Sequence, residues 1–166
     1  MNLNWVRCIG IGVGIGVLVL SLGCASTPAN PPVLQPTIWP TPTSSQVSSP
    51  FGMRGNKLHK GLDIAVPKKS PVVATAPGWV TYEGRDWDGY GKYLKIDHGN
   101  GYETLYAHLN AKEVKEGQYV ARGQLIGRVG KTGNATGYHL HYEVRINGRP
   151  VNPTAYLPES LYARSR

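Results

Sequence analysis

The segment Tyr138–Ile146 reads Tyr-His-Leu-His-Tyr-Glu-Val-Arg-Ile. Apolar or aromatic side chains alternate with polar ones along it, which is the period of a β-strand with one face in a core. On such a strand His139 and His141 point the same way and lie about 6.6 Å apart. The segment therefore predicts a strand that carries two histidines on the polar, open face of a sheet.

Similar short runs, rich in β-branched and aromatic residues, recur along the chain between glycine-containing turns. No window shows a sustained helical period of apolar residues. Strands so close together in sequence favour antiparallel pairing in a sandwich or an open barrel. We therefore predict one all-β domain of antiparallel sheets over residues 49–158. Its expected strands are Pro71–Ala76, Trp79–Glu83, Tyr93–Asp97, Glu103–His108, Gln124–Val129 and His139–Ile146.

The composition fits a single domain and excludes cysteine chemistry within it. The chain has 166 residues with 21 Gly and 13 Pro, a proportion that favours short strands and turns over long helices. Its two cysteines, Cys8 and Cys24, lie near the N-terminus, so the predicted domain has no thiol for catalysis or for a zinc site. The formal net charge of +8 favours anionic cell-wall polymers as partners.

The first residues have the pattern of an export signal. One positive charge precedes the uncharged apolar run Ile9–Leu22, which is short for a membrane span. The segment Leu20–Cys24 resembles a bacterial lipobox, in which the cysteine is lipidated and becomes the mature N-terminus. We predict a lipoprotein signal peptide over residues 1–23 and a lipid on Cys24 that holds the exported protein on an envelope membrane (the periplasmic face in a Gram-negative cell). An ordinary cleaved signal or an uncleaved anchor is the alternative.

The predicted domain is flanked by two segments without a core of their own. Residues 25–50 contain seven prolines together with serine and threonine, a composition typical of a semi-rigid tether. We therefore predict a tether over residues 24–48, which would let the domain reach away from the membrane. Residues 159–166 are predicted to be a C-terminal tail.

All five histidines fall in the predicted domain, at positions 59, 98, 108, 139 and 141. His59 and Asp63 lie four residues apart, but Gly61 and the following Ile64–Pro67 favour a bent loop or strand over a helix. A catalytic zinc ion needs three protein ligands of nitrogen or oxygen type and one open position. The chain offers such a set with histidines left over to move protons, and spacing alone leaves open whether His139 or His141 holds the metal.

Three motifs match, in order, the signatures of the lysostaphin-type zinc metallopeptidases (the LytM-like family). They are His59-x-x-x-Asp63, Tyr106-Ala107-His108-Leu109 and His139-Leu140-His141. The flanking segments Ser49–Arg54, Pro77-Gly78, Asp97–Gly101 and Gly137–Glu143 also resemble that family. The resemblance covers nearly the whole predicted domain and implies an antiparallel β fold of the duplicated hybrid motif type.

The resemblance also implies an activity and its residues. It implies hydrolysis of peptide bonds in the cross-links or bridges of peptidoglycan, with stem or bridge peptides as substrates. By motif position, His59, Asp63 and His141 would bind one zinc ion, and His108 and His139 would be catalytic. Arg54 and Tyr106 are weaker candidates for contacts with the substrate, since a turn-bracing arginine and a core tyrosine explain them equally well.

Three other functions are weighed against this one. A catalytically silent LytM-like protein would activate another wall hydrolase through an envelope partner, but the intact histidine and aspartate set opposes it. The segment Gly117–Gly127 resembles the repeated turn of lipoyl and biotin carriers, which need a modifiable lysine at a hairpin tip. The pI of about 9.6 would suit nucleic-acid binding, but the basic residues are scattered and the protein is predicted to be exported. We therefore expect no nucleic-acid partner.

Overall fold

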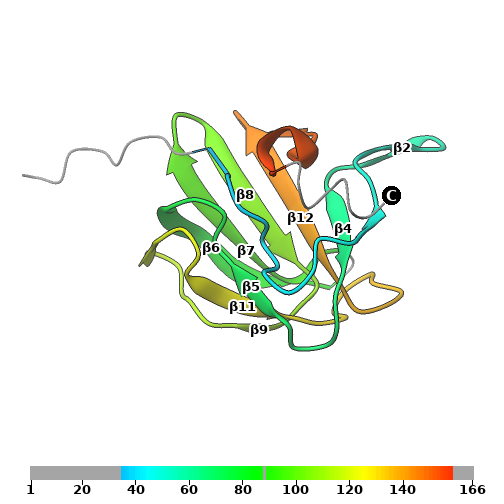
Figure 1. Cartoon of the computed structure of the whole chain (residues 1–166), viewed down its shortest axis with the longest axis horizontal. Coiled ribbons are helices and arrows are strands. Elements are labelled where there is room, and N and C mark those ends of the chain that lie inside the picture. The colour runs from blue at the N-terminus through cyan, green and yellow to red at the C-terminus, as the bar shows by residue number, and fades with distance from the viewer. Residues whose placement is uncertain (1–34, 88, 159–166) are drawn as a thin grey trace, which may run out of the picture.

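Short and medium β-strands make up most of the structure, a computed structural model that describes residues 35–87 and 89–158 (Figure 1). The strands are β1 (Val47–Ser49), β2 (Gly52–Arg54), β3 (Lys57–His59), β4 (Leu62–Ala65), β5 (Pro71–Val73), β6 (Gly78–Asp86), β7 (Gly91–Gly99), β8 (Tyr102–Ala107), β9 (Leu109–Lys112), β10 (Tyr119–Val120), β11 (Leu125–Val129), β12 (His139–Ile146) and β13 (Arg149–Val151). A 3-10 helix, η1 (Pro153–Tyr156), follows them.

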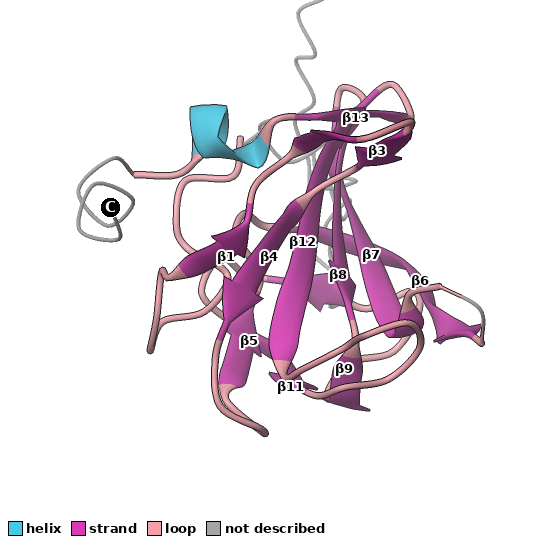
Figure 2. Ribbon diagram, turned by 90° about the vertical axis from the view of Figure 1, so that its right-hand side faces the viewer, coloured by secondary structure: helices cyan, strands magenta, loops and turns pink. Residues whose placement is uncertain are grey.

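The strands form three antiparallel sheets in the described part of the chain. An eight-stranded sheet has the order β1-β4-β12-β8-β7-β6-β10, with β13 paired to β12. A three-stranded sheet has the order β5-β11-β9, and β2 and β3 form a separate hairpin. Figure 2 shows the small sheet near the lower ends of β4, β12 and β8. The prediction of an all-β, antiparallel architecture is confirmed.

The core joins the large sheet to the small one. Leu140, Tyr142 and Val144 of β12 are fully buried, as the alternation along this strand predicts. Val72 of β5 and Ile126 of β11 belong to the same apolar cluster. The face of β12 that lacks the histidines therefore packs on the core, and the histidine face is left to build a site.

The prediction that the histidine face of β12 is open to solvent is wrong in the middle of the strand. His141 is only 6% exposed and Glu143 is not exposed at all. Two neighbours cover this part of the sheet: Tyr90 donates a hydrogen bond to Glu143, and Arg145 donates another. The polar residues of this face are thus buried with partners instead of being solvated.

All six predicted strands coincide with observed ones, with some changes at their ends. The run Pro71–Ala76 is a strand only over Pro71–Val73, and His108 lies just beyond the end of β8. The expected strand Tyr93–Asp97 extends further in the structure, so that His98 lies within β7. The strands missing from the prediction are short: β1, β2, β3, β4, β9, β10 and β13. Two to four residues carry too little alternation to be recognised.

The segment Gly117–Gly127 does not form the hairpin of a carrier domain. Its first strand, β10, pairs with β6 in the large sheet, and its second, β11, pairs with β5 in the small sheet. The segment therefore crosses from one sheet to the other and contains no lysine to be modified. The structure does not support the carrier interpretation.

The second half of the predicted tether is part of the domain. Trp39 is only 4% exposed and belongs to the apolar core cluster. The backbone around it is also fixed, because Thr37 donates to the Thr75 carbonyl at 3.2 Å and Val73 donates to the Pro40 carbonyl at 2.9 Å. The prolines of this stretch prevent regular structure, but they do not prevent one large aromatic side chain from anchoring it.

We expect Trp39→Ala to lower the free energy of unfolding by about 3–5 kcal/mol, because it removes a buried aromatic side chain and leaves a cavity. Urea denaturation followed by circular dichroism measures the change. Trp87→Ala is the matched control, since Trp87 is 72% exposed and should change the stability little. Equal, small effects of the two substitutions would show that residues 35–46 are only a tether.

The predicted signal peptide (residues 1–23), Cys24, the first part of the tether and the predicted tail (residues 159–166) lie outside the described residues. Within residues 35–87 and 89–158, no helix is long and apolar enough to span a membrane.

Candidate metal centre

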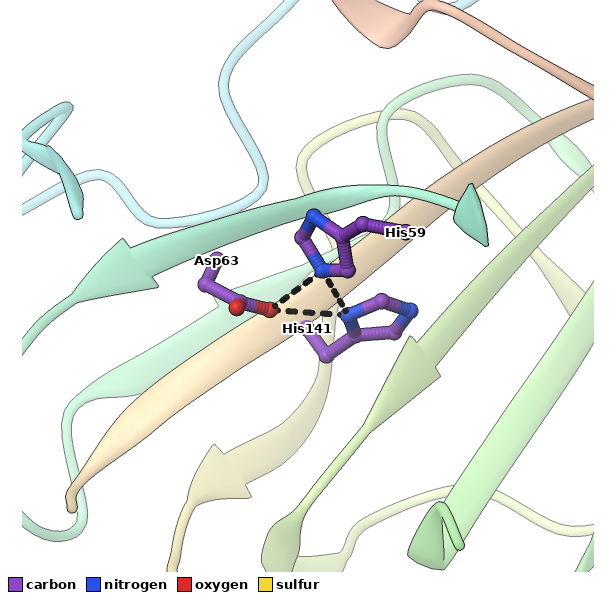
Figure 3. A group of neighbouring side chains, drawn as sticks. All are labelled: His59, Asp63 and His141. Atoms are coloured by element: carbon purple, nitrogen blue, oxygen red, sulfur yellow. Dashed lines mark hydrogen bonds and ion pairs between the residues drawn. The ribbon is translucent and has the colours of Figure 1, made fainter. Parts of the chain in front are cut away.

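Two neighbouring strands and one hairpin bring His59, Asp63 and His141 together (Figure 3). Asp63 on β4 and His141 on β12 are direct partners in the antiparallel register. His59 is the last residue of β3, and the chain bends at Gly61 before β4 begins. Only glycine fits there, because a Cβ would collide with the carbonyl oxygen of Tyr142. The expectation of a bent loop or strand instead of a helix is confirmed.

Three side-chain atoms of this group form a small triangle. His59 Nε2 lies 3.1 Å from Asp63 Oδ1 and 3.2 Å from His141 Nδ1, and the latter two atoms are 2.8 Å apart. The ligand atoms of a tetrahedral zinc ion, with bonds of about 2.0–2.1 Å, are separated by about 3.3 Å. The donor set, two imidazoles and one carboxylate, is also typical of zinc sites that keep one position open. The triangle therefore fits a zinc ion.

Each imidazole of the site has one nitrogen that faces an oxygen acceptor outside the triangle. A carbonyl or carboxylate oxygen can only accept, so the ring nitrogen that faces it carries the hydrogen. The pairs are His59 Nδ1 with Pro50 O (2.6 Å), His108 Nδ1 with Thr132 O (2.8 Å), His139 Nδ1 with Gly137 O (3.1 Å) and His141 Nε2 with Glu143 Oε1 (3.0 Å). Nε2 of His108 and of His139 is therefore the nitrogen with the lone pair. His59 Nε2 and His141 Nδ1 both face Asp63 Oδ1, and they would offer lone pairs to a cation bound between these three atoms. His59 Nδ1 also lies 2.9 Å from Arg54 Nη2.

Two carboxylates supply negative charge to the centre, the partly buried Asp63 and the fully buried Glu143. Burial alone would raise the pKa of Asp63, but hydrogen bonds from His141 and Arg54 outweigh burial and hold this pKa well below its usual value. Arg54 Nη2 lies 2.9 Å from Asp63 Oδ2. Burial likewise opposes ionisation of Glu143, and hydrogen bonds from His141 and Tyr90 outweigh it and lower the pKa. Both groups are therefore ionised at neutral pH.

His108 and His139 stand beside the triangle, with ring centroids 4.7 Å apart. His108 follows β8 with a φ of 59°, and its backbone N–H donates to the Tyr90 carbonyl at 2.8 Å. Burial lowers the pKa of His108 to about 4, although the hydrogen bond to Thr132 opposes this effect. His139 Nε2 lies 3.7 Å from Asp63 Oδ1. His108 is therefore neutral at pH 7 and can accept a hydrogen bond at Nε2.

The site opens into a cleft of about 590 Å³. All five predicted metal-binding and catalytic residues line it. The hairpin β2–β3 and the residue after it contribute three cations, Arg54, Lys57 and Lys60. The loop before β12 contributes the polar side chains of Asn134 and Thr136. The cleft is therefore polar, and its positive charge lies on and next to the β2–β3 hairpin.

The two weaker candidates from the sequence have different positions. Arg54 lines the cleft, and its guanidinium contacts Asp63 and the hydroxyl of Ser49. Tyr106 is not exposed at all and faces the core, where its hydroxyl accepts a hydrogen bond from the backbone N–H of Thr75 at 3.0 Å. The prediction that Tyr106 contacts the substrate is therefore wrong, and the alternative, a core tyrosine, holds. Along β8 this side chain points to the core face of the sheet, away from the cleft.

His98 stands apart from the site. It is 2% exposed, and its ring nitrogens lie 2.7 Å from the Pro77 carbonyl oxygen and 2.7 Å from the Thr104 hydroxyl.

Two side chains that belong to the site, Tyr90 and Glu143, are not predicted from the sequence. Glu143 could have been found, because it lies two residues after His141 on the same face of a strand. Tyr90 could not, since nothing in a single sequence relates it to Glu143 across 53 positions.

Comparison with known proteins supports the resemblance seen in the motifs. A sequence model of peptidase family M23 matches residues 57–153. The DD-carboxypeptidase/endopeptidase Mpg of Neisseria meningitidis serogroup B is 51% identical over 117 residues, which are 67% of this chain and 27% of that protein. The murein hydrolase activator NlpD of Escherichia coli K12 is 42% identical over 123 residues, which are 73% of this chain and 31% of that protein.

A solved structure agrees with these matches. The crystal structure of a zinc containing peptidase from Vibrio cholerae superposes with a TM-score of 0.68 and 38% identity, covering 72% of this chain and 40% of the other. The present chain spans less than a third of the length of Mpg and of NlpD. The matched residues 57–153 are more than half of the chain and include the whole candidate centre, so the chain belongs to peptidase family M23, the lysostaphin-type (LytM-like) metallopeptidases.

Proposed function

We propose that this domain is a zinc metalloendopeptidase that hydrolyses peptide bonds in the cross-links or bridges of peptidoglycan. The observation that carries the proposal is the convergence of three atoms that can bind a metal ion, His59 Nε2, Asp63 Oδ1 and His141 Nδ1, within 3.2 Å of one another. One zinc ion per domain would be held by these residues. When bound, such an ion polarises a peptide carbonyl and lowers the pKa of a coordinated water molecule.

The other two imidazoles of the cleft supply proton transfer. His108 is held by Thr132 and Tyr90, and His139 is held by Gly137, so both rings have fixed orientations. Each leaves its Nε2 free to accept a proton from water or to protonate the leaving amine. We assign the two roles to the pair and not to either ring alone.

The charge of the cleft supports an acidic peptide as the substrate. Lys57 and Lys60 are exposed cations at its lining, and Arg54 is about half exposed. The two carboxylates of the lining, Asp63 and Glu143, already have partners among the described residues. A peptide that carries free carboxylates, as peptidoglycan stem peptides do, complements such a surface.

The proposed place of action is the cell envelope. Mpg is named a DD-carboxypeptidase/endopeptidase, and the name of NlpD refers to a murein hydrolase. The predicted signal peptide and lipid on Cys24 would deliver this domain to the envelope, where murein lies. The stretch between Cys24 and the first core residue, Trp39, is the remaining tether.

We expect Cys24→Ser to release the protein from the membrane fraction or to leave an unprocessed precursor, because the lipid would be attached to this thiol. Cell fractionation with immunoblotting measures both outcomes. Cys8→Ser is the control and should change nothing, since Cys8 precedes the apolar run. Unaltered size and membrane retention of the Cys24 variant would indicate direct insertion of Ile9–Leu22 instead.

The similarity to NlpD supports a second candidate, an activator of another wall hydrolase that does not itself cut the wall. The experiment that separates the two uses purified peptidoglycan and the protein from residue 25 onward, with and without a chelator. Digestion products are identified by mass spectrometry, and adsorption to the wall is measured in the same samples. New peptide fragments that disappear with the chelator support the peptidase. Normal adsorption without new fragments, in the presence of added zinc, supports the activator.

A further inference from the structure

Glu143 is a fully buried acidic side chain in direct contact with the candidate metal centre. A carboxylate without solvent needs partners for both oxygens, because burying an unpaired charge is costly. Here Oε1 accepts from the Tyr90 hydroxyl at 2.6 Å and from His141 Nε2 at 3.0 Å, and Oε2 accepts from Arg145 Nε at 2.7 Å. The carboxylate is therefore held from three sides, and its orientation toward His141 is fixed.

His141 differs from the other rings of the site in what fixes it. The three other imidazoles donate to backbone carbonyl oxygens of Pro50, Thr132 and Gly137. His141 donates to a side chain, and it is also the one that presents Nδ1 to the triangle. Because a carboxylate also stabilises positive charge on the ring, it makes the opposite nitrogen a stronger ligand than a carbonyl would.

We propose that Glu143 is a positioning residue that sets the tautomer and raises the basicity of His141, with Tyr90 and Arg145 as its supports. The inference rests on the proposed ligand role of His141. Tyr90 has a second part in it, because its carbonyl oxygen accepts the backbone N–H of His108 at 2.8 Å. Tyr90, in the loop between β6 and β7, therefore contacts both the Glu143 carboxylate and the backbone of His108.

The first test measures zinc affinity by competition with a chromophoric chelator, using apo-protein and zinc ions. We expect Glu143→Gln to weaken zinc binding about 10–100-fold. Glu103→Gln is the matched control: Glu103 also faces Arg145, at 3.8 Å, but does not contact His141, so zinc affinity should stay at the parent value. Equal zinc affinity of the parent and Glu143→Gln proteins would overturn the proposal.

A second variant keeps the test decisive if Glu143→Gln does not fold. Tyr90→Phe removes only the hydroxyl that donates to Oε1 and keeps the ring, so zinc affinity should fall by less than in Glu143→Gln but measurably. In the zinc-loaded parent, nitrogen-15 NMR should also show the His141 ring N–H downfield and slow to exchange, because it donates to a buried carboxylate. This resonance should move upfield in Glu143→Gln and stay in place in Glu103→Gln. An unchanged zinc affinity in Tyr90→Phe, or an unchanged resonance in Glu143→Gln, would contradict the proposal.

Failure of this inference is distinguishable from failure of the proposed function. If the parent binds zinc and the variants bind it more weakly, but no protein cuts the wall, the positioning role stands and the peptidase is excluded. If the parent cuts the wall and all variants bind zinc equally, only the positioning role is excluded. If the parent binds no zinc, both are overturned.

Discussion

Replacing His141 by alanine is expected to remove zinc and wall cleavage together. His141 Nδ1 is one corner of the ligand triangle, 2.8 Å from Asp63 Oδ1 and 3.2 Å from His59 Nε2. Without it two protein ligands remain, and a catalytic zinc site needs three. Elemental analysis of the purified variant measures the metal. We expect most of the zinc to be lost and cleavage to fall to the level of the chelated parent.

The matched control for this variant is His139→Ala. His139 lies two residues away on the same face of β12 and is fixed by the Gly137 carbonyl, but it is not part of the triangle. It should keep most of the zinc and lose activity. Equal zinc loss in the two variants would show that the division of roles within this histidine pair is wrong.

The second large effect is expected for His108→Ala, which should keep the zinc and lower the rate of cleavage about 100- to 10,000-fold. Burial lowers the pKa of His108 to about 4, so the ring is neutral at pH 7. Its Nε2 is then available to accept a hydrogen bond from the attacking water and orient it. Alanine removes this function without touching a ligand of the triangle. The rate is measured at saturating substrate on metal-loaded protein.

Two comparisons make the His108 result interpretable. The zinc content of the variant must match that of the parent, and Trp87→Ala, an exposed change outside the cleft lining, should keep the full rate. A His108→Ala protein that retains zinc and cuts at the parental rate would exclude His108 from the reaction.

The sequence predicts the part of this fold that has long strands. β12 shows the clearest alternation, and its core face is occupied by the expected residues Leu140, Tyr142 and Val144. The short strands β1 to β4 build one side of the site but carry no periodic signal. Their positions depend on register with β12, such as the pairing of Asp63 with His141, which is a tertiary property.

Two corrections have the same physical origin. The proline, serine and threonine around Trp39 predict a tether, yet a single buried aromatic ring fixes that segment on the domain. Tyr106 was considered for the substrate because it stands in a signature motif, yet it faces the core. Local composition and motif membership do not report the direction of an individual side chain.

The candidate residues of the centre follow from the sequence, and the family resemblance also implies their roles, but residue spacing alone does not. The spacing of His139 and His141 does not say which ring meets His59 and Asp63, whereas the triangle includes only His141. The ring orientations depend on the backbone carbonyls of Pro50, Thr132 and Gly137, and the contacts of these carbonyls with the rings are set by the fold. Tyr90 enters through a contact with Glu143 across 53 positions.

The most direct test of the central claim is a titration of metal-free protein with zinc while peptide release from purified peptidoglycan is measured. If His59, Asp63 and His141 hold one catalytic ion, cleavage should rise in proportion to added zinc and level off at one equivalent per domain. The same titration of His141→Ala should stay flat. Cleavage by the metal-free protein, or no cleavage after one equivalent of zinc has bound, would contradict the account.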